Sequence, residues 1–136
     1  MNIDEIDQLV TTPELDVVRI VSVQDREVLL VKESDDPNWK LPGGKIHAGE
    51  TIFEALVREI EEELGITVAR EDILNYQSAK IPHSENIRHL FLLKTIQEDQ
   101  VLATEEVEEC GYFSVEDLPE TKFKEHIASA FEIISS

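Results

Sequence analysis

The sequence predicts a mixed α/β sandwich, and three observations support this fold class. The chain has 136 residues, which suits one domain with one sizeable core, so we expect residues 1–136 to form a single domain. Both β-branched strand patterns and amphipathic helical patterns occur along it. They do not alternate as regular βαβ units, which favours a mixed sheet over a doubly wound parallel one.

The first elements are expected to be a short helix and a β-hairpin. Apolar residues at helical spacing predict a helix over residues 3–10. Residues 17–23 are rich in β-branched side chains and predict a strand, and residues 28–31 predict the returning strand after a polar turn. A polar loop follows, and residues 39–44 predict an extended segment that leads into a glycine loop.

The strongest helical pattern spans residues 51–64. Thr51 and Glu54 have the spacing of a capping box at its start. Gly65 follows as the expected C-terminal glycine. One face of the helix is apolar at i, i+3 and i+4 spacing. That face consists of Phe53, Leu56, Val57, Ile60 and Leu64.

The C-terminal half is expected to add three strands and a final helix. The strands are predicted over residues 73–81, 87–96 and 108–114. The final helix is predicted over residues 122–134, where apolar side chains again recur at helical spacing. The sequence contains no internal repeat and no low-complexity linker.

The chain is strongly acidic, with 30 Asp and Glu against 12 Lys and Arg and a formal net charge of −18. This balance argues against binding of a nucleic-acid polymer, but a bound divalent cation would still admit a small phosphate-bearing ligand. No apolar run approaches the length of a membrane span, and the acidic start lacks the order of a signal peptide. The single cysteine, Cys110, cannot form an intramolecular disulfide. We therefore expect a cytoplasmic protein without a membrane partner.

Three glutamates lie on one side of the predicted main helix. Glu59, Glu62 and Glu63 fall within an arc of about 100°, where like charges repel one another. A solvated acidic face is one interpretation, and it would be preferred for the helix alone. A hard divalent cation bound by the carboxylate oxygens is the other. Gly43 and Gly44 favour it, because glycines before a helix let the backbone approach a ligand closely.

The glycines and glutamates together are similar to the Nudix box, G-x5-E-x7-R-E-U-x-E-E-x-G-U, where U is an aliphatic residue. Gly44 is followed after five residues by Glu50 and after seven more by residues 58–66, REIEEELGI. Every fixed position of the box is filled. Residues 39–44 and 112–119 also resemble segments outside the box in this family. The chain thus resembles a Nudix domain over most of its length.

The resemblance implies a fold, an activity and a cofactor. The fold would be an α/β/α sandwich with a mixed central sheet, in which the box forms a loop-helix-loop. The activity would be a pyrophosphohydrolase that cleaves a nucleoside diphosphate linked to another group, using Mg²⁺ or Mn²⁺. Glu59, Glu62 and Glu63 would be metal ligands, while Glu59 or Glu62 would alternatively act as, or orient, the general base. Glu61 occupies the variable position of the box and is expected to be solvated.

The resemblance also suggests roles for residues around this cluster. Arg58 would hold a glutamate by charge-assisted hydrogen bonds, most simply Glu50, and Gly65 would end the helix. Many family members add an acidic ligand from a later loop. Residues 98–109 contain six acids and no base, and Glu106 is our choice among them, although a solvated acidic loop explains them equally well.

The candidate substrate contacts lie near the glycine loop and in a later strand. Gly43, Gly44 and Lys45 would face the phosphates. Arg88 would contact a phosphate or stack on a base, or it would be a surface strand residue paired with a cross-strand acid. The residues alone favour neither interpretation. His126 is expected on the surface of the last helix.

The short chain is most similar to the nucleoside-triphosphate group of the family, which includes the MutT-like enzymes that remove oxidised dGTP. Nucleoside triphosphates or oxidised (d)NTPs are therefore the expected substrates. ADP-ribose or dinucleoside polyphosphate hydrolysis is the alternative, and Pro82 lies at about the spacing of a proline in some ADP-ribose hydrolases. A nucleotide sensor without turnover is a third reading, but such a domain would be expected to lose a ligand glutamate. Many relatives dimerise, so the resemblance also allows a homodimer.

Overall fold

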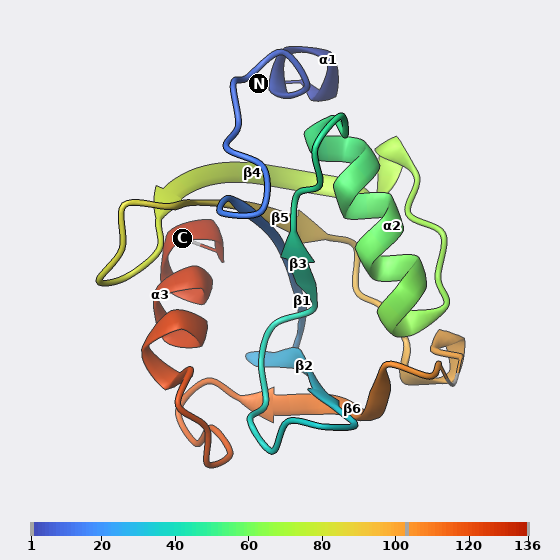
Figure 1. Ribbon diagram of the computed structural model, residues 1–136. Coiled ribbons are helices and arrows are strands. Elements are labelled where there is room, and N and C mark those ends of the chain that lie inside the picture. Colours follow the sequence, from blue (N-terminus) through green and yellow to red (C-terminus); the bar gives the residue numbers. More distant parts are fainter. Residues whose placement is uncertain (1, 103, 136) are drawn as a thin grey trace.

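The computed structural model describes residues 2–102 and 104–135, in which a six-stranded sheet lies between two helices (Figure 1). The strands are β1 (Val17–Gln24), β2 (Glu27–Glu33), β3 (Gly43–Lys45), β4 (Ile73–Lys80), β5 (Ile87–Leu93) and β6 (Val107–Ser114). The helices are α1 (Ile3–Ile6), α2 (Ile52–Leu64) and α3 (Lys124–Ser135), with two short 3-10 turns at Arg70–Asp72 and Glu98–Gln100.

The sheet is mixed, as the sequence predicts. Its order is β4-β5-β1-β2-β6, and β3 pairs with β1 outside this path. β1 and β5 are parallel, and the other pairs are antiparallel. α2 and α3 lie on opposite sides of the sheet, which confirms the α/β/α sandwich (Figure 1).

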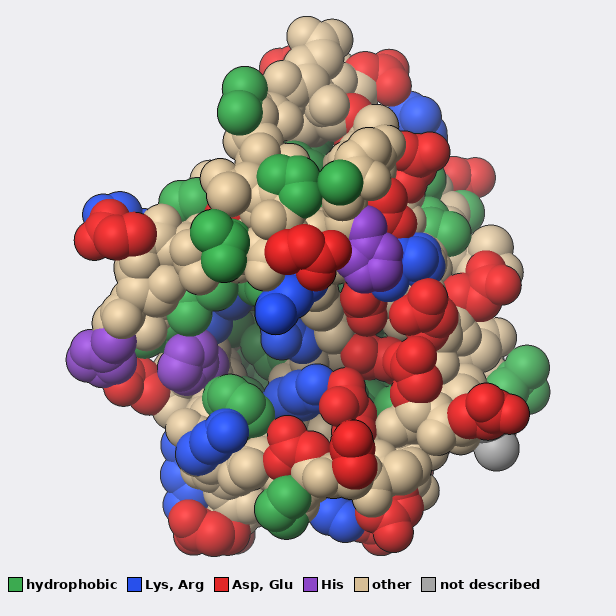
Figure 2. Space-filling model, in the orientation of Figure 1, with side chains coloured by type: hydrophobic (Ala, Val, Ile, Leu, Met, Phe, Trp, Pro, Cys, Tyr) green, Lys and Arg blue, Asp and Glu red, His purple; other side chains and the backbone are tan. Residues whose placement is uncertain are grey.

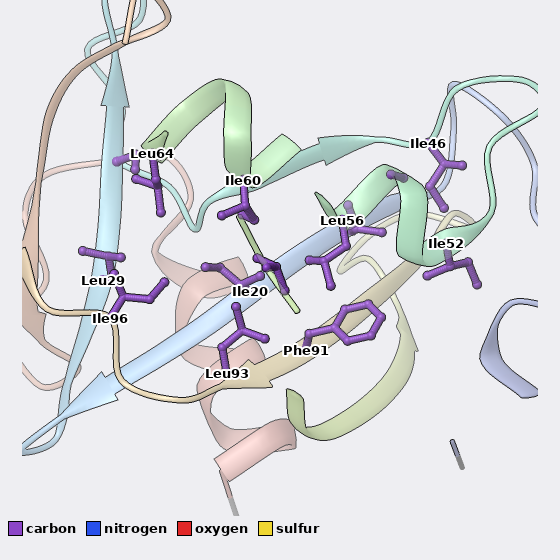
Figure 3. Close-up of a cluster of buried hydrophobic side chains, with 14 of the residues drawn as sticks. Ile20, Leu29, Ile46, Ile52, Leu56, Ile60, Leu64, Phe91, Leu93 and Ile96 are labelled. Atoms are coloured by element: carbon purple, nitrogen blue, oxygen red, sulfur yellow. The ribbon is translucent and has the colours of Figure 1, made fainter. Parts of the chain in front are cut away.

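Alternating residues of the central strands build two cores. In β2, Leu29 and Val31 join the core under α2, whereas Val28 and Leu30 join the core under α3. This period of two is the pattern of a strand that is buried on both faces. Figure 3 shows part of the α2 core, in which side chains of the helix meet those of the central strands.

The ends of α2 follow the sequence prediction closely. The Thr51 hydroxyl accepts a hydrogen bond from the Glu54 N–H, and the Glu54 carboxylate accepts one from the Thr51 N–H. Gly65 adopts a left-handed conformation with a φ of 68°, and its N–H donates to the Glu61 carbonyl. These two caps fix the helix that carries the glutamate cluster.

Two predicted boundaries are wrong by more than two residues. The first helix ends at Ile6 rather than at residue 10, because the next N–H groups, of Gln8 and Leu9, bond three residues back instead of four. The strand predicted over residues 87–96 ends at Leu93. Beyond it the Ile96 N–H donates to a side chain, the Ser22 hydroxyl, rather than to a strand carbonyl. The segment predicted to be extended, residues 39–44, includes the start of the short strand β3.

Within the described ranges, no helix is both long enough and apolar enough to span a bilayer.

Candidate functional site

A cleft of about 890 Å³ lies beside α2 and β3. Its size falls within the range of small-molecule binding sites. Four parts of the chain supply its walls, namely residues 14–19 at the start of β1, residues 33–40 from the end of β2 onward, residues 43–63 around the Nudix-like box, and the loop that precedes β6. Figure 2 shows a dense group of Asp and Glu side chains on this face, next to several Lys and Arg side chains.

Arg58 is the centre of a charge network in this cleft. Its Nε and Nη2 donate to the two oxygens of Glu50 at 2.6 and 2.9 Å, so the predicted pair with Glu50 is present. Its Nη1 donates to Glu59 Oε1 at 2.8 Å and to Glu62 Oε2 at 3.3 Å. The hydrogen bonds from Arg58 hold the pKa of the Glu50 carboxyl below its usual value. Arg58 therefore orients three carboxylates at once.

Glu63 is the most buried of the clustered glutamates, with 2% of its surface exposed. Its Oε1 accepts a hydrogen bond from the Gly43 N–H at 3.0 Å. Burial raises the pKa of the Glu63 carboxyl to about 8, and the neighbouring Glu59 adds to the rise. A buried carboxyl beside a second one gains stability from a cation, since a positive charge favours its ionised form. The Gly43 N–H is therefore already hydrogen-bonded within the protein.

Glu59 depends on the absence of a side chain at Gly44. A Cβ at that position would lie 2.6 Å from Glu59 Oε1, well inside van der Waals contact. Glu59 itself is 8% exposed. The glycine of the motif therefore makes room for a carboxylate of the same motif.

The donor set fits a hard cation such as Mg²⁺ or Mn²⁺. Glu59, Glu62 and Glu63 line the same cleft as Glu106, which comes from the loop before β6. Burial raises the pKa of Glu106, and so do the charges of Glu62 and Glu59. Carboxylate oxygens are the ligands that such ions prefer. In the part of the chain that the structure describes, no three acidic, histidine or cysteine side chains are already arranged to hold one ion. Arg58 takes up oxygens of Glu59 and Glu62, so binding would require these side chains to turn towards the ion.

Comparison with known proteins identifies the family. Residues 13–133 match the NUDIX domain. The chain belongs to the Nudix family. Residues 44–66 are therefore its Nudix box, and the arginine-centred network described above is built from that box.

Two Nudix relatives and one solved structure illustrate the similarity. The ADP-ribose pyrophosphatase of Methanocaldococcus jannaschii is 32% identical over 105 residues, which are 74% of this chain and 62% of that protein. The putative 8-oxo-dGTP diphosphatase of Bacillus subtilis is 43% identical over 77 residues, which are 53% of this chain and 47% of that protein. The chain thus matches between about half and three fifths of the length of these relatives. The crystal structure of a UDP-X diphosphatase has a TM-score of 0.69 and 26% identity, covering 93% of this chain and 63% of that one.

The predicted substrate contacts divide between two places. Gly44 and the exposed Lys45 line the acidic cleft, together with Gly43. Arg88 does not line it and lies in a second cavity instead. It is 3% exposed, so its interpretation as a surface strand residue is wrong. His126, expected on the surface, is half-buried and lines the same second cavity.

Arg19 is a residue of the site that the sequence prediction did not include. It lines both the acidic cleft and the second cavity, and its Nη1 donates to the Leu41 carbonyl at 3.1 Å. The sequence contains a signal for it. Arg19 lies between Val17 and Val21 at strand spacing, so its side chain is expected on the same face of the strand as these two apolar residues.

Proposed function

We propose that this Nudix protein hydrolyses the pyrophosphate bond of a nucleoside diphosphate linked to another group, with Mg²⁺ or Mn²⁺ as cofactor. The observation that carries the proposal is the convergence of the box glutamates with Glu106 in one cleft, where Arg58 is hydrogen-bonded to Glu59 and Glu62. The names of both relatives, a pyrophosphatase and a putative diphosphatase of nucleotides, support it.

Each group in the cleft has a chemical task in this proposal. Glu59, Glu62, Glu63 and Glu106 would hold the ion. A bound ion would neutralise phosphate charge and lower the pKa of a bound water, which supplies a nucleophile near neutral pH. Glu59 or Glu62 would serve as, or orient, the general base. Arg58 donates a hydrogen bond to each of these two carboxylates and so holds them at the cleft.

Nucleoside triphosphates, including oxidised ones, are the substrate class that we propose first, because the short chain resembles that group of the family. ADP-ribose is the second candidate. It is favoured by the 32% identity to an ADP-ribose pyrophosphatase over 105 residues. The products separate the two, since a triphosphate would yield pyrophosphate and a monophosphate, whereas ADP-ribose would yield AMP and ribose phosphate.

The test combines a substrate panel with three variants of one helix. Phosphate release would be measured with Mg²⁺ and with Mn²⁺ on unmodified and oxidised dNTPs, ADP-ribose, nucleotide sugars and dinucleoside polyphosphates. Glu62→Gln and Glu63→Gln are each expected to lower turnover on the order of a hundredfold, because each removes a ligand charge. Glu61→Gln is the matched control, since this exposed neighbour does not line the cleft.

Two results would contradict the proposal. Near-normal turnover in both Glu62→Gln and Glu63→Gln would show that the ligands are wrongly assigned. A silent panel, with metal binding demonstrated by titration, would favour a nucleotide sensor without turnover.

A further inference from the structure

A smaller cavity of about 160 Å³ lies beside the acidic cleft, between α3 and the sheet. None of its lining residues comes from the Nudix box. Most of its wall is apolar, with Phe123 and Ile127 from the C-terminal segment and Ile81 directly after β4. Its position and walls are therefore distinct from those of the carboxylate cluster.

The cavity and the cleft adjoin each other. Val17, Arg19 and Lys40 line both. Figure 2 shows a hollow with hydrophobic side chains at its base, bordered by Lys and Arg on the side that faces the acidic group. A ligand whose phosphates lie in the cleft can thus extend into the cavity past Arg19.

Two polar side chains of the cavity, Arg88 and His126, are incompletely hydrogen-bonded. Arg88 is buried, and its Nη1 and Nη2 donate to neutral oxygens, the His126 carbonyl at 2.8 Å and the Ser129 hydroxyl at 2.9 Å. Its Nε is buried without a hydrogen-bond partner among the described residues, and so is Nδ1 of His126. No Asp or Glu lines the cavity. A buried cation without a counter-charge is costly, and acceptor atoms of a ligand would offset that cost.

The walls and the charges together select one kind of occupant. A free phosphate would gain little from apolar walls, whereas a flat ring would bury its faces against Phe123 and the aliphatic side chains. A guanidinium pairs well with a carbonyl oxygen and a ring nitrogen on the edge of a base. An exocyclic amino group would instead place donor against donor.

We propose that this cavity binds the nucleobase of the substrate and prefers a base with a carbonyl oxygen, such as guanine, over adenine. Arg88 and Arg19 supply the donors, and Phe123 supplies the apolar wall. This inference rests on the proposed function, because the acidic cleft must hold the phosphates of the same molecule.

The experiment compares GMP with AMP, which have the same size and charge. Affinities would be measured by calorimetry on the full chain with Mg²⁺ present. GMP is expected to bind at least about tenfold more tightly, which corresponds to one good arginine–base pairing. Ile81→Trp, which fills the cavity from its rim without removing a buried charge, is expected to weaken GMP binding at least about tenfold. Leu74→Trp, at an exposed position of β4, is the control and should leave it unchanged.

The inference would be overturned by equal binding of GMP and AMP, by tighter binding of AMP, or by unchanged GMP binding in Ile81→Trp. Displacement of GMP by an equal concentration of inorganic phosphate would also overturn it, since the site would then recognise an anion. If turnover persists in any of these cases, the proposed function stands and only the base pocket fails. Selective GMP binding without turnover of any nucleotide would support the pocket and contradict the proposed activity.

Discussion

At the scale of single residues, the acidic cleft depends on the lack of a side chain at Gly44. The backbone of Gly44 is not left-handed, so its conformation alone does not require glycine. A Cβ added at this position would, however, lie 2.6 Å from the carboxylate of Glu59. Gly44→Ala is therefore expected to push this flexible carboxylate away from Arg58. We expect turnover to fall at least about tenfold, while the free energy of unfolding changes by less than about 1 kcal/mol.

Gly111→Ala is the control for this prediction. A Cβ at Gly111 would lie 3.8 Å from its nearest neighbour, an ordinary contact with Phe113. Turnover and denaturant unfolding would be measured for both variants. Normal turnover in Gly44→Ala would show that the position of Glu59 does not matter for the reaction. A large loss of stability would mean that Gly44 has a structural role instead.

The candidate site was predictable where its residues are neighbours in sequence. Glu59, Glu62 and Arg58 share one helix, so the spacing alone places them together. The burial of Arg88 is different, because it depends on α3 covering β5 from a distant part of the chain. The sequence still contained a clue, since Arg88 has the same strand parity as Leu90, which joins the core under α3.

At the scale of secondary-structure elements, the C-terminal end of α2 is fixed by Gly65. Its φ of +68° is unfavourable for other residues, and a Cβ there would lie 2.7 Å from Leu102 Cβ. Gly49 has a φ of +83° but open space around it. Both alanine substitutions should cost about 1–2 kcal/mol of backbone strain. Gly65→Ala should cost about 1 kcal/mol more, because Leu102 must also move.

Chemical denaturation of the two glycine variants measures this difference directly. Equal losses of unfolding free energy would show that Leu102 yields without cost. A larger loss in Gly49→Ala than in Gly65→Ala would contradict the assignment of Gly65 as the cap that fixes the helix end.

Local sequence patterns predicted the longer helices and strands. The short strand β3 and the strand order depend instead on pairing between distant strands. α2 has a clear helical period and a cap at each end, and β1 is a run rich in β-branched residues, so their positions follow from local sequence. β3 has only three residues and exists because it pairs with β1 in an antiparallel register. The strand order likewise depends on the parallel contact of β1 with β5, which joins residues about seventy positions apart. Local patterns contain no information of this kind.

At the scale of the whole molecule, part of the excess negative charge gathers in the acidic cleft, where eight Asp and Glu side chains lie with four Lys and Arg side chains. The net charge is −18, and Arg58 alone is hydrogen-bonded to three carboxylates, those of Glu50, Glu59 and Glu62. One cation cannot neutralise three carboxylates, and Glu106 adds to the excess. The folded state therefore holds repulsion that the unfolded chain relieves by separating these groups.

A divalent cation that binds this cleft should consequently stabilise the folded protein. We expect millimolar Mg²⁺ to raise the melting temperature, because an ion that binds only the native state adds about 1.4 kcal/mol for each tenfold excess over its Kd. NaCl at matched ionic strength tests general screening and should raise it less. The double variant of Glu62→Gln with Glu63→Gln should lose the response to Mg²⁺ but keep the response to NaCl, since it removes ligand charge and not overall acidity. Identical curves in Mg²⁺ and NaCl, or an undiminished response in the double variant, would show that the acidity of this face is only a solvated surface.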